Sequence, residues 1–470
     1  QGVKGQRSKL ILSSKTASSK ITKELTGADF KVTKVTNKEV HTRPAPPFIT
    51  STLQQEAGRK LRFSAKRTMA VAQQLYEGIS IASGEAVGLI TYMRTDSTQV
   101  APQALQEARQ YIKQHYGLAY LPKSPRFYSK KAKGAQEAHE AIRPTSMFRD
   151  PDNIKPYLKP EQLRLYDLIW KRMLSSQMTD AESDSTRVDI EASKPTSSTK
   201  IFLLKASGSV VKFEGFRVLY SETRDDNSND RQETTLPKLS AKEKLGCTNI
   251  SALQHFTQPL PRYTEAMLVR TLEEKGIGRP STYAPTISLI QDRNYVNKEQ
   301  GHFKPTRLGT VVSDHLTDHF PGIMDLGFTV QMEESLDQIA EGTKKWVPVL
   351  QEFYGPFQKA LAAATELMPR VKVEEPSDEV CELCGQPMVI KTSRFGRFLA
   401  CSGFPECRGK KSLLKKTGVT CPGCTTGELV ERRGKGRPFY GCTQYPNCKF
   451  IITKQPLKEP CPECNSLLLV

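Results

Sequence analysis

The sequence predicts a multidomain α+β protein that ends in small cysteine-rich modules, and three observations support this prediction. The chain has 470 residues, enough for roughly three domains of ordinary size. Blocks with helical hydrophobic spacing alternate with strand-like blocks up to residue 372. Ten of the 11 cysteines follow residue 380.

The first part of the chain is predicted to be a helical region with β-type segments on both sides. Residues 1–43 are polar and contain a strand-like stretch at 30–35, and the Pro-rich joint at 43–47 marks a boundary. After the joint we expect a helix through Leu53 and Ala57 capped by Thr50 or Ser51, a strand at 89–94, a helix from Pro102 to Gly117 and a helix over 161–178.

The next part alternates more strongly and then returns to helices. Strands are expected near 187–191, 200–205 and 210–220. Two helices from Thr264 onward flank the turn at 276–282, and a hairpin follows, which predicts a helix–turn–helix with a strand wing. Further helices are expected near 306–319, 332–340 and 347–366, and the acidic stretch 373–380 is expected to be a linker.

The C-terminal cysteines are spaced like zinc ligands. Two sets each combine a Cys-x2-Cys pair with a Cys-x5-Cys pair, while Cys461 and Cys464 form only half a set. Four thiolates in two close pairs suit tetrahedral Zn²⁺, with Zn–S bonds of about 2.3 Å. The alternative, a disulfide framework, requires an oxidising compartment, and the chain opens without a secretory signal. The expected ligands are Cys381, Cys384, Cys401, Cys407, Cys421, Cys424, Cys442 and Cys448.

The charge balance indicates a polyanionic partner. The formal net charge is +19, and residues 381–470 carry 15 Lys and Arg against 6 Asp and Glu. Aromatic residues alternate with these basic residues, and bases of a single strand stack on such side chains with about 1–3 kcal/mol each. The alternative is that the aromatics form the ribbon cores, which stays open for Phe398 and Tyr440. The candidate DNA contacts here are Arg394, Phe395, Arg397 and Arg437.

Two functional classes are excluded by the patterns of the sequence. No run of about 18 apolar residues occurs, so no transmembrane helix is expected. No Gly-x4-Gly-Lys-Ser/Thr motif occurs, so the chain is not an ATP-driven motor of that type.

Tyr92 is the candidate nucleophile. A phenol with a pKa near 10 reacts poorly at neutral pH unless nearby cations stabilise its charged form. Arg94, two residues further along, can do this and can also stabilise the charge of a phosphoryl transition state. His139 is a candidate for phosphate contact or proton transfer, or alternatively a hydrogen-bonded structural histidine.

Four segments carry a resemblance to bacterial type IA DNA topoisomerase I. They are 47–55 (Pro-Phe-Ile-Thr-Ser-Thr-Leu-Gln-Gln), 88–97 (Gly-Leu-Ile-Thr-Tyr-Met-Arg-Thr-Asp-Ser), 138–144 (Ala-His-Glu-Ala-Ile-Arg-Pro) and 276–283 (Gly-Ile-Gly-Arg-Pro-Ser-Thr-Tyr). The cysteine repeats resemble the zinc ribbons of that family, so the resemblance covers nearly the whole chain.

The resemblance implies an isomerase that relaxes negatively supercoiled DNA without ATP. Tyr92 would attack a phosphodiester to form a 5′-phosphotyrosyl bond, the other strand would pass through the gap, and the freed 3′-hydroxyl would reseal it. Arg94 would hold the scissile phosphate. The partner would be single-stranded or underwound DNA, and the protein a cytoplasmic monomer on the bacterial chromosome. The implied backbone contacts are His139, Arg143, Arg279, Ser281 and Thr282, of which Arg279 and Thr282 also lie at a helix start suited to phosphate.

The resemblance also implies a toroidal core. A β-rich arch would carry a helical tyrosine-bearing domain, and a base with a winged-helix-like element would precede the ribbons. The expected ranges are 1–43 and 186–258 for the arch, 44–185 for the tyrosine-bearing domain, 259–372 for the base, 373–380 for the linker, 381–411 and 421–452 for the ribbons and 461–470 for a truncated ribbon.

One departure from the family pattern concerns the metal that assists cleavage. The family has a Toprim domain ahead of this region, with an acidic Mg²⁺ site, and no Asp-x-Asp-x-Glu occurs here. We therefore expect a fragment that binds single-stranded DNA but cleaves it inefficiently alone. The alternative function is a non-catalytic zinc-ribbon DNA-binding protein. A relaxase would need clustered histidines, which the sequence lacks, and a recombinase would leave a 3′-linked adduct.

Overall fold

The computed structural model describes residues 12, 14–81, 84–128, 140–194, 201–222, 235–369, 375–393, 396–412, 415–433, 438–464 and 466–469. The chain divides into two compact units. The first comprises residues 1–306 and 316–361, and the second comprises residues 307–315 and 362–470. Within the described residues, no helix is both long and apolar enough to cross a membrane.

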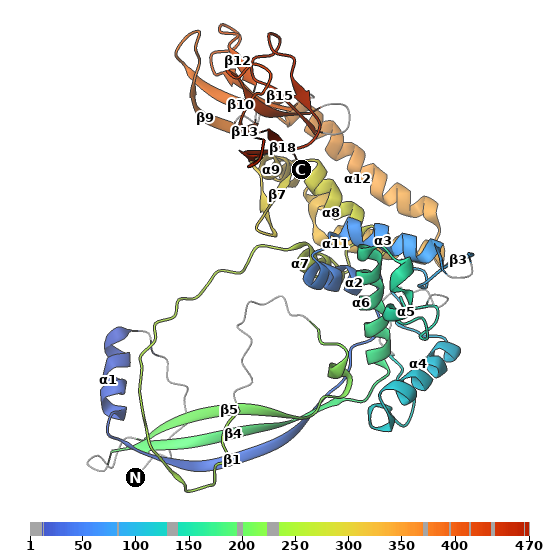
Figure 1. Ribbon diagram of the computed structural model, residues 1–470, viewed down its shortest axis with the longest axis vertical. Helices are drawn as coiled ribbons and strands as arrows, with labels where there is room; N and C mark the ends of the chain where they lie inside the picture. Colours follow the sequence, from blue (N-terminus) through green and yellow to red (C-terminus); the bar gives the residue numbers. More distant parts are fainter. Residues whose placement is uncertain are drawn as a thin grey trace. The chain divides into compact units, whose positions relative to one another are not determined.

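Unit one contains a four-stranded antiparallel sheet in the order β5-β4-β1-β6 (Figure 1). Its strands are β1 (Asp29–Thr42), β4 (Ala181–Ser193), β5 (Ile201–Phe213) and β6 (Lys244–Leu245), and helix α1 (Lys15–Leu25) precedes them. β1 and β4 pair from Thr42 opposite Ala181 to Asp29 opposite Ser193. The residues between β1 and β4 therefore form an insert that leaves and re-enters the sheet at one end.

Two strand predictions needed correction here. The strand expected at 30–35 extends to Thr42 as β1. The strands expected at 200–205 and 210–220 are one strand, β5, because Ser207, Gly208 and Ser209 pair with β4 instead of turning. Beyond Phe213 the chain forms the 3₁₀ helix η4 (Gly215–Val218).

The insert is a helical domain with a large apolar core. Its α- and π-helices are α2 (Thr50–Glu56), the π-helix η1 (Ala57–Leu61), α3 (Ala65–Glu77), α4 (Pro102–His115), α5 (Pro151–Ile154) and α6 (Pro160–Ser176). Its short elements are β2 (Ile79–Ser80), β3 (Ala86–Val87), and the 3₁₀ helices η2 (Leu118–Tyr120) and η3 (Lys155–Tyr157). α4 begins with Pro102 at its first turn and ends before Gly117, whose φ of 89° is accessible to glycine.

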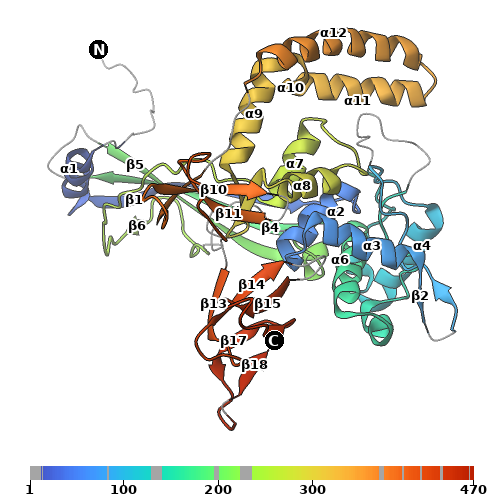
Figure 2. The ribbon, with the colours of Figure 1, turned by 90° about the horizontal axis from the view of Figure 1, so that it is seen from above.

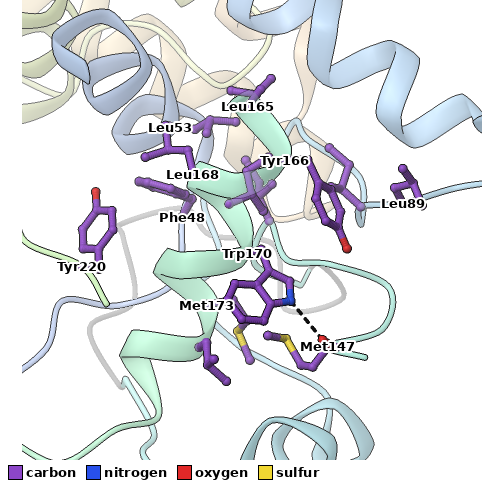
Figure 3. Close-up of a cluster of buried hydrophobic side chains, with 14 of the residues drawn as sticks. Phe48, Leu53, Leu89, Met147, Leu165, Tyr166, Leu168, Trp170, Met173 and Tyr220 are labelled. Carbon is purple, nitrogen blue, oxygen red and sulfur yellow. Dashed lines mark hydrogen bonds between the residues drawn. The ribbon is translucent and has the colours of Figure 1, made fainter. Parts of the chain in front are cut away.

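The core of the insert is organised around α6. Tyr166 and Met173 are fully buried and pack with Phe48 and Leu53 (Figure 3). The Trp170 Nε1–H donates a hydrogen bond of 3.0 Å to the Met147 carbonyl, so the polar atom of a buried indole is satisfied.

The chain after the sheet is helical up to residue 367 and contains the expected helix–turn–helix. α7 (Glu265–Glu274) and α8 (Tyr283–Asp292) are followed by the hairpin of β7 (Val296–Glu299) and β8 (His302–Pro305), as predicted. The helices that follow are α9 (Arg307–His319), α10 (Pro321–Met324), α11 (Leu326–Ala340) and α12 (Trp346–Leu367). α11 starts six residues before its predicted start, because the Asp325 carboxylate caps it by accepting the Gly327 N–H at 2.8 Å.

α11 lies alongside the first part of α12 (Figure 2), where Phe328 contacts Phe353 with ring centroids 5.8 Å apart.

Unit two contains three small sheets. The first has the order β12-β11-β10-β9 and the second β13-β14-β15-β16, and β17 pairs with β18. The strands are β9 (Glu375–Val380), β10 (Pro387–Ser393), β11 (Gly396–Cys401), β12 (Lys410–Ser412), β13 (Lys415–Thr420), β14 (Glu428–Arg433), β15 (Pro438–Cys442), β16 (Ile451–Ile452), β17 (Pro456–Pro460) and β18 (Leu467–Leu469). The acidic stretch predicted to be a linker contains β9, which is paired to β10 as an edge strand.

Candidate functional site

The turn that carries Tyr92 is fastened to the start of α2 by one buried threonine. The Thr50 hydroxyl donates to the Met93 carbonyl at 2.7 Å and accepts the Thr95 N–H at 2.9 Å. The Thr50 N–H also donates to the Thr95 carbonyl at 2.9 Å. Thr50 is fully buried, so its bonds hold the backbone directly after Tyr92 out of reach of competing water.

The backbone before Tyr92 is held by a third segment. The Thr91 N–H donates to the Arg143 carbonyl at 2.9 Å, and the Thr91 hydroxyl donates to the Ala141 carbonyl at 2.7 Å. The Ile142 N–H donates to the Phe48 carbonyl at 2.8 Å. Parts of the first three sequence segments that carry the resemblance therefore meet at one place, although they are far apart in sequence.

These contacts replace the strand predicted at 89–94. The structure has only an isolated bridge between Ile90 and Pro144 there, because hydroxyl and carbonyl groups of the loops satisfy the backbone instead of a ladder. The helix predicted after the Pro-rich joint is α2, but Ile49, not Thr50 or Ser51, is its N-cap residue. The Thr52 hydroxyl accepts the Ile49 N–H at 3.0 Å.

The side chains of the turn alternate between core and solvent. Met93 and Thr95 are buried, while Tyr92 and Arg94 are exposed. The Tyr92 side chain is 43% exposed, and its ring meets the edge of Tyr76 with centroids 5.3 Å apart. A phenol and a guanidinium are thus presented to solvent from a rigid backbone, which is the arrangement a nucleophile and its phosphate-binding partner require.

Arg143 is part of the framework of this site. Its Nη2 pairs with Glu140 Oε2 at 2.7 Å and its Nη1 donates to the Pro144 carbonyl at 2.9 Å. Glu140 in turn accepts the Ala101 N–H at the start of α4. His139 lies outside the described residues.

Two ion pairs also connect the turn before α8 to α11. Arg279 Nη1 pairs with Glu333 Oε2 at 2.6 Å, and Nη2 pairs with Asp337 Oδ2 at 2.7 Å, both on α11. Ser281 and Thr282 are exposed beside it. The sequence prediction missed these two acidic partners, although their i, i+4 spacing places both on one face of a helix.

Burial raises the pKa of Tyr283 to about 12, so this phenol remains protonated behind the turn.

The eight predicted zinc ligands form two compact clusters. Within each set of four, the Sγ atoms lie within 4.8 Å of one another. The Cys384–Cys401 sulfurs are 3.3 Å apart and the Cys424–Cys442 sulfurs 3.5 Å apart. A tetrahedral site with Zn–S bonds of about 2.3 Å requires sulfurs about 3.8 Å apart, so both sets fit Zn²⁺ closely.

In each cluster, backbone amides favour the thiolate form of one cysteine. The Leu383 N–H lowers the pKa of the Cys381 thiol to about 7, and the Gly427 N–H lowers that of Cys424 to about 6. Cys461 and Cys464 form no group of three or more ligands among the described residues.

Each ribbon presents one aromatic ring beside a cation. Phe404 is 57% exposed with Lys391 Nζ 5.6 Å from its ring centre, and Tyr445 is 58% exposed with Arg432 Cζ at 5.5 Å. Tyr440 is buried, which favours the alternative that it forms part of the core of its ribbon. Arg394, Phe395 and Arg437 lie outside the described residues, and of Arg397 only the backbone, in β11, is described.

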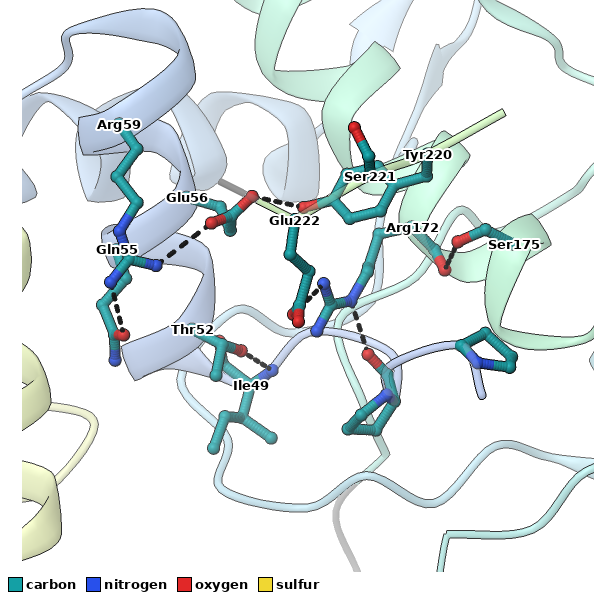
Figure 4. Close-up of polar contacts among 12 residues, drawn as sticks. Ile49, Thr52, Gln55, Glu56, Arg59, Arg172, Ser175, Tyr220, Ser221 and Glu222 are labelled. Carbon is teal, nitrogen blue, oxygen red and sulfur yellow. Dashed lines mark hydrogen bonds and ion pairs between the residues drawn. The ribbon is translucent and has the colours of Figure 1, made fainter. Parts of the chain in front are cut away.

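A further polar cluster, missed by the sequence prediction, lies where the sheet joins the insert (Figure 4). The buried Arg172 donates to the Pro46 carbonyl at 2.6 Å and pairs with Glu222 at 2.7 Å. The Tyr220 hydroxyl donates to the buried Glu56 carboxylate at 2.6 Å. Burial raises the pKa of Tyr220, which keeps this donor protonated.

The fold and the site define a class of protein, one with an exposed tyrosine at a rigid turn, a helix–turn–helix and two Cys₄ clusters in small sheets. Comparison with known proteins agrees. A family model described as "DNA topoisomerase" matches residues 2–351, and one described as "Topoisomerase DNA binding C4 zinc finger" matches residues 378–416 and 418–456. The chain therefore belongs to the bacterial type IA DNA topoisomerase I family.

A solved structure agrees with this assignment. Full-length topoisomerase I from Thermotoga maritima is 34% identical, with a TM-score of 0.66 over 88% of this chain. The chain spans 63% of that protein's length.

Proposed function

We propose that this chain carries the cleaving tyrosine of an enzyme that relaxes negatively supercoiled DNA without ATP. The observation that carries the proposal is Tyr92, which stands exposed on a backbone held by a buried hydrogen bond on one side and a partly buried one on the other. Such a fixed, accessible phenol suits reversible attack on a phosphodiester, since the nucleophile must return to the same geometry for resealing.

The proposed step exchanges one phosphodiester for another. The Tyr92 oxygen bonds to phosphorus and its proton passes to solvent, while the bond from phosphorus to the 3′ oxygen breaks and that oxygen takes a proton. The product is a 5′-phosphotyrosyl ester and a 3′-hydroxyl. Resealing is the reverse reaction, so no other energy source is needed. Arg94 would neutralise the phosphate during both steps.

The remaining contacts would hold the strand. Ser281 and Thr282 are exposed at the start of α8, where the positive end of the helix dipole favours phosphate. Arg279 would add positive potential there although its guanidinium is already paired with α11. His139 and Arg143 are proposed to act beside Tyr92, and the ribbons to bind single-stranded DNA through Phe404, Tyr445 and their basic neighbours.

We expect Zn²⁺ to bind to the cysteine ribbons of this chain and Mg²⁺ to bind to the acidic domain of the family. The Cys₄ sets would hold Zn²⁺, which stabilises the ribbon folds. Among the described residues, the groups suited to a metal are these two sets, so the residues present do not fit the family's Mg²⁺. We propose that the chain as printed binds single-stranded DNA as a monomer but cleaves it efficiently only together with the family's acidic domain, in the cytoplasm on the chromosome.

Covalent trapping tests the proposal. End-labelled single-stranded DNA is mixed with the chain, with and without the acidic domain and Mg²⁺, and a 5′-linked adduct is expected in the complete mixture. Tyr92→Phe should abolish it, whereas Tyr76→Phe, at the neighbouring exposed ring, should not. A 3′-linked adduct would indicate recombinase chemistry. No adduct with intact DNA binding would favour the non-catalytic alternative.

A further inference from the structure

The last turn of α3 lies directly against the segment that leads to Tyr92. Gly78, whose φ of 119° lies outside the helical region, ends α3. β2 and β3 then pair antiparallel, with Ile79 opposite Val87. Because this pairing reverses the chain, Gly88 returns to the end of the helix that the chain has just left.

The returning backbone is fixed to α3 at two consecutive residues. The Leu89 N–H donates to the Leu75 carbonyl at 2.8 Å, and both leucine side chains are fully buried. At Gly88, a Cβ atom would lie 2.8 Å from the Tyr76 carbonyl oxygen, so only glycine allows this close approach. On the other side, the Thr145 hydroxyl donates to the Gly88 carbonyl at 2.8 Å. The end of α3 and the segment that carries the nucleophile therefore form one rigid piece of backbone.

This arrangement brings the ring of Tyr76 against the ring of Tyr92. The ring centroids are 5.3 Å apart and the ring planes are inclined by 63°, the edge-to-face geometry that the charge distribution of aromatic rings favours. Tyr76 is 41% exposed and Tyr92 43%, so the apolar core encloses neither ring. Exposed side chains without such a contact change rotamer within nanoseconds, so the contact restricts the motion of the Tyr92 ring.

A contact between rings suits a nucleophile better than a hydrogen bond would. A hydrogen bond to the phenol would occupy the oxygen that has to reach phosphorus, whereas a ring contact restrains the side chain and leaves that oxygen free. Correct orientation of a reacting group contributes strongly to the rate, and a misplacement of about 1 Å can cost about 100-fold. A restraint on the ring of Tyr92 therefore acts directly on the attack.

We propose that Tyr76 is a positioning residue for the reaction of Tyr92. Its ring limits the rotation of the nucleophile, so the phenol oxygen is presented to the scissile phosphate in the orientation that attack requires. The hydroxyl of Tyr76 has no part in this role. The inference rests on the proposed function, because it concerns attack by Tyr92 on DNA.

Single-turnover adduct formation tests this role in the zinc-loaded full-length gene product that contains this sequence, with Mg²⁺ and saturating end-labelled single-stranded DNA. Tyr76→Leu should slow adduct formation by about tenfold, with unchanged affinity for the oligonucleotide. Tyr76→Phe keeps the ring and should retain the natural rate. Tyr157→Leu is the matched control, because Tyr157 is 42% exposed on the same insert, and it should also retain the natural rate.

A spectroscopic measurement tests the restraint itself, without DNA. The same proteins are labelled with 3-fluorotyrosine, and the ¹⁹F signal of Tyr92 is identified as the one that Tyr92→Phe removes. Tyr76→Leu should narrow this signal and move it toward the position of free fluorotyrosine, because the neighbouring ring is lost. Tyr76→Phe should leave it close to its original position.

The outcomes separate this inference from the proposed function. A natural adduct rate with Tyr76→Leu, an unmoved ¹⁹F signal, or a slow rate with Tyr76→Phe would overturn the positioning role and leave cleavage by Tyr92 intact. Weaker DNA binding by Tyr76→Leu with a natural rate at saturation would make Tyr76 a DNA contact instead. Absence of an adduct in the natural protein would overturn the proposed function, and the positioning role with it.

Discussion

At the scale of single residues, the site depends on Thr50 as much as on Tyr92. The buried Thr50 hydroxyl satisfies the Met93 carbonyl and the Thr95 N–H together, so it fixes the backbone that presents the phenol. Thr50→Val keeps the shape but leaves both groups unpaired, at about 1–3 kcal/mol each. We expect adduct formation to fall by about 10- to 100-fold with little change in DNA affinity.

Thr50→Ser is the matched variant for that test. It keeps the hydroxyl and should retain most of the adduct rate, because only a methyl group is lost. Equal adduct rates for the Val and Ser variants would show that the hydroxyl does not position Tyr92.

Arg62 offers a residue-scale test of stability. It ends η1 in the left-handed region, with φ 58° and ψ 30°, where a side chain costs roughly 1–2 kcal/mol. Arg62→Gly removes that strain but gives the unfolded chain more freedom, so a net gain of about 0.5–1 kcal/mol is expected. Urea unfolding measures it, with Arg67→Gly in the first turn of α3 as a control that should destabilise.

At the scale of elements, each ribbon has an exposed aromatic ring that we expect to contact DNA. Phe404 and Tyr445 occupy equivalent exposed positions with a cation beside each ring. Phe404→Ala and Tyr445→Ala should each weaken binding of single-stranded oligonucleotides by about 1–3 kcal/mol. Leu383→Ala, exposed in the first ribbon, should have little effect. Fluorescence anisotropy at a fixed salt concentration measures the affinity of each variant for the oligonucleotide. An equal loss of affinity in all three variants would exclude stacking on Phe404 and Tyr445.

The ribbons should also lose zinc independently. The two cysteine clusters belong to separate small cores, so Cys401→Ser should release one zinc equivalent and unfold only the first ribbon. Colorimetric zinc release and amide exchange would measure this. Loss of both metals from the single variant would mean that the ribbons fold together.

Elements could be predicted from the sequence where the signal, hydrophobic periodicity or ligand spacing, involves residues close together in the chain. The Pro102 start and Gly117 stop of α4, and the Cys-x2-Cys spacing of the ribbons, lie within a few residues and led to the correct elements. The strand predicted at 89–94 was wrong because Thr50 and Arg143, distant in sequence, supply the hydrogen bonds. Tyr92 is a candidate because of its motif, and the residues that anchor its backbone could be found only in three dimensions.

At the scale of the whole insert, stability at its attachment to the sheet should depend on Arg172. Its guanidinium ties α6 to the Pro-rich joint and to the chain returning from β5, through the Pro46 carbonyl and Glu222. It also stacks on Phe48 and Tyr220, with its Cζ 4.9 Å and 5.2 Å from the ring centres. Three separate stretches of chain therefore converge on one buried cation.

Arg172→Met keeps a long apolar side chain but leaves the Pro46 carbonyl and the Tyr220 face without the charge. We expect a loss of about 2–4 kcal/mol, measured by Trp170 fluorescence during urea unfolding in a Trp346→Phe background. Arg217→Met, exposed on the same returning segment, should change stability by less than about 0.5 kcal/mol. Equal losses of stability for the two substitutions would mean that the apolar core alone stabilises the attachment of the insert to the sheet.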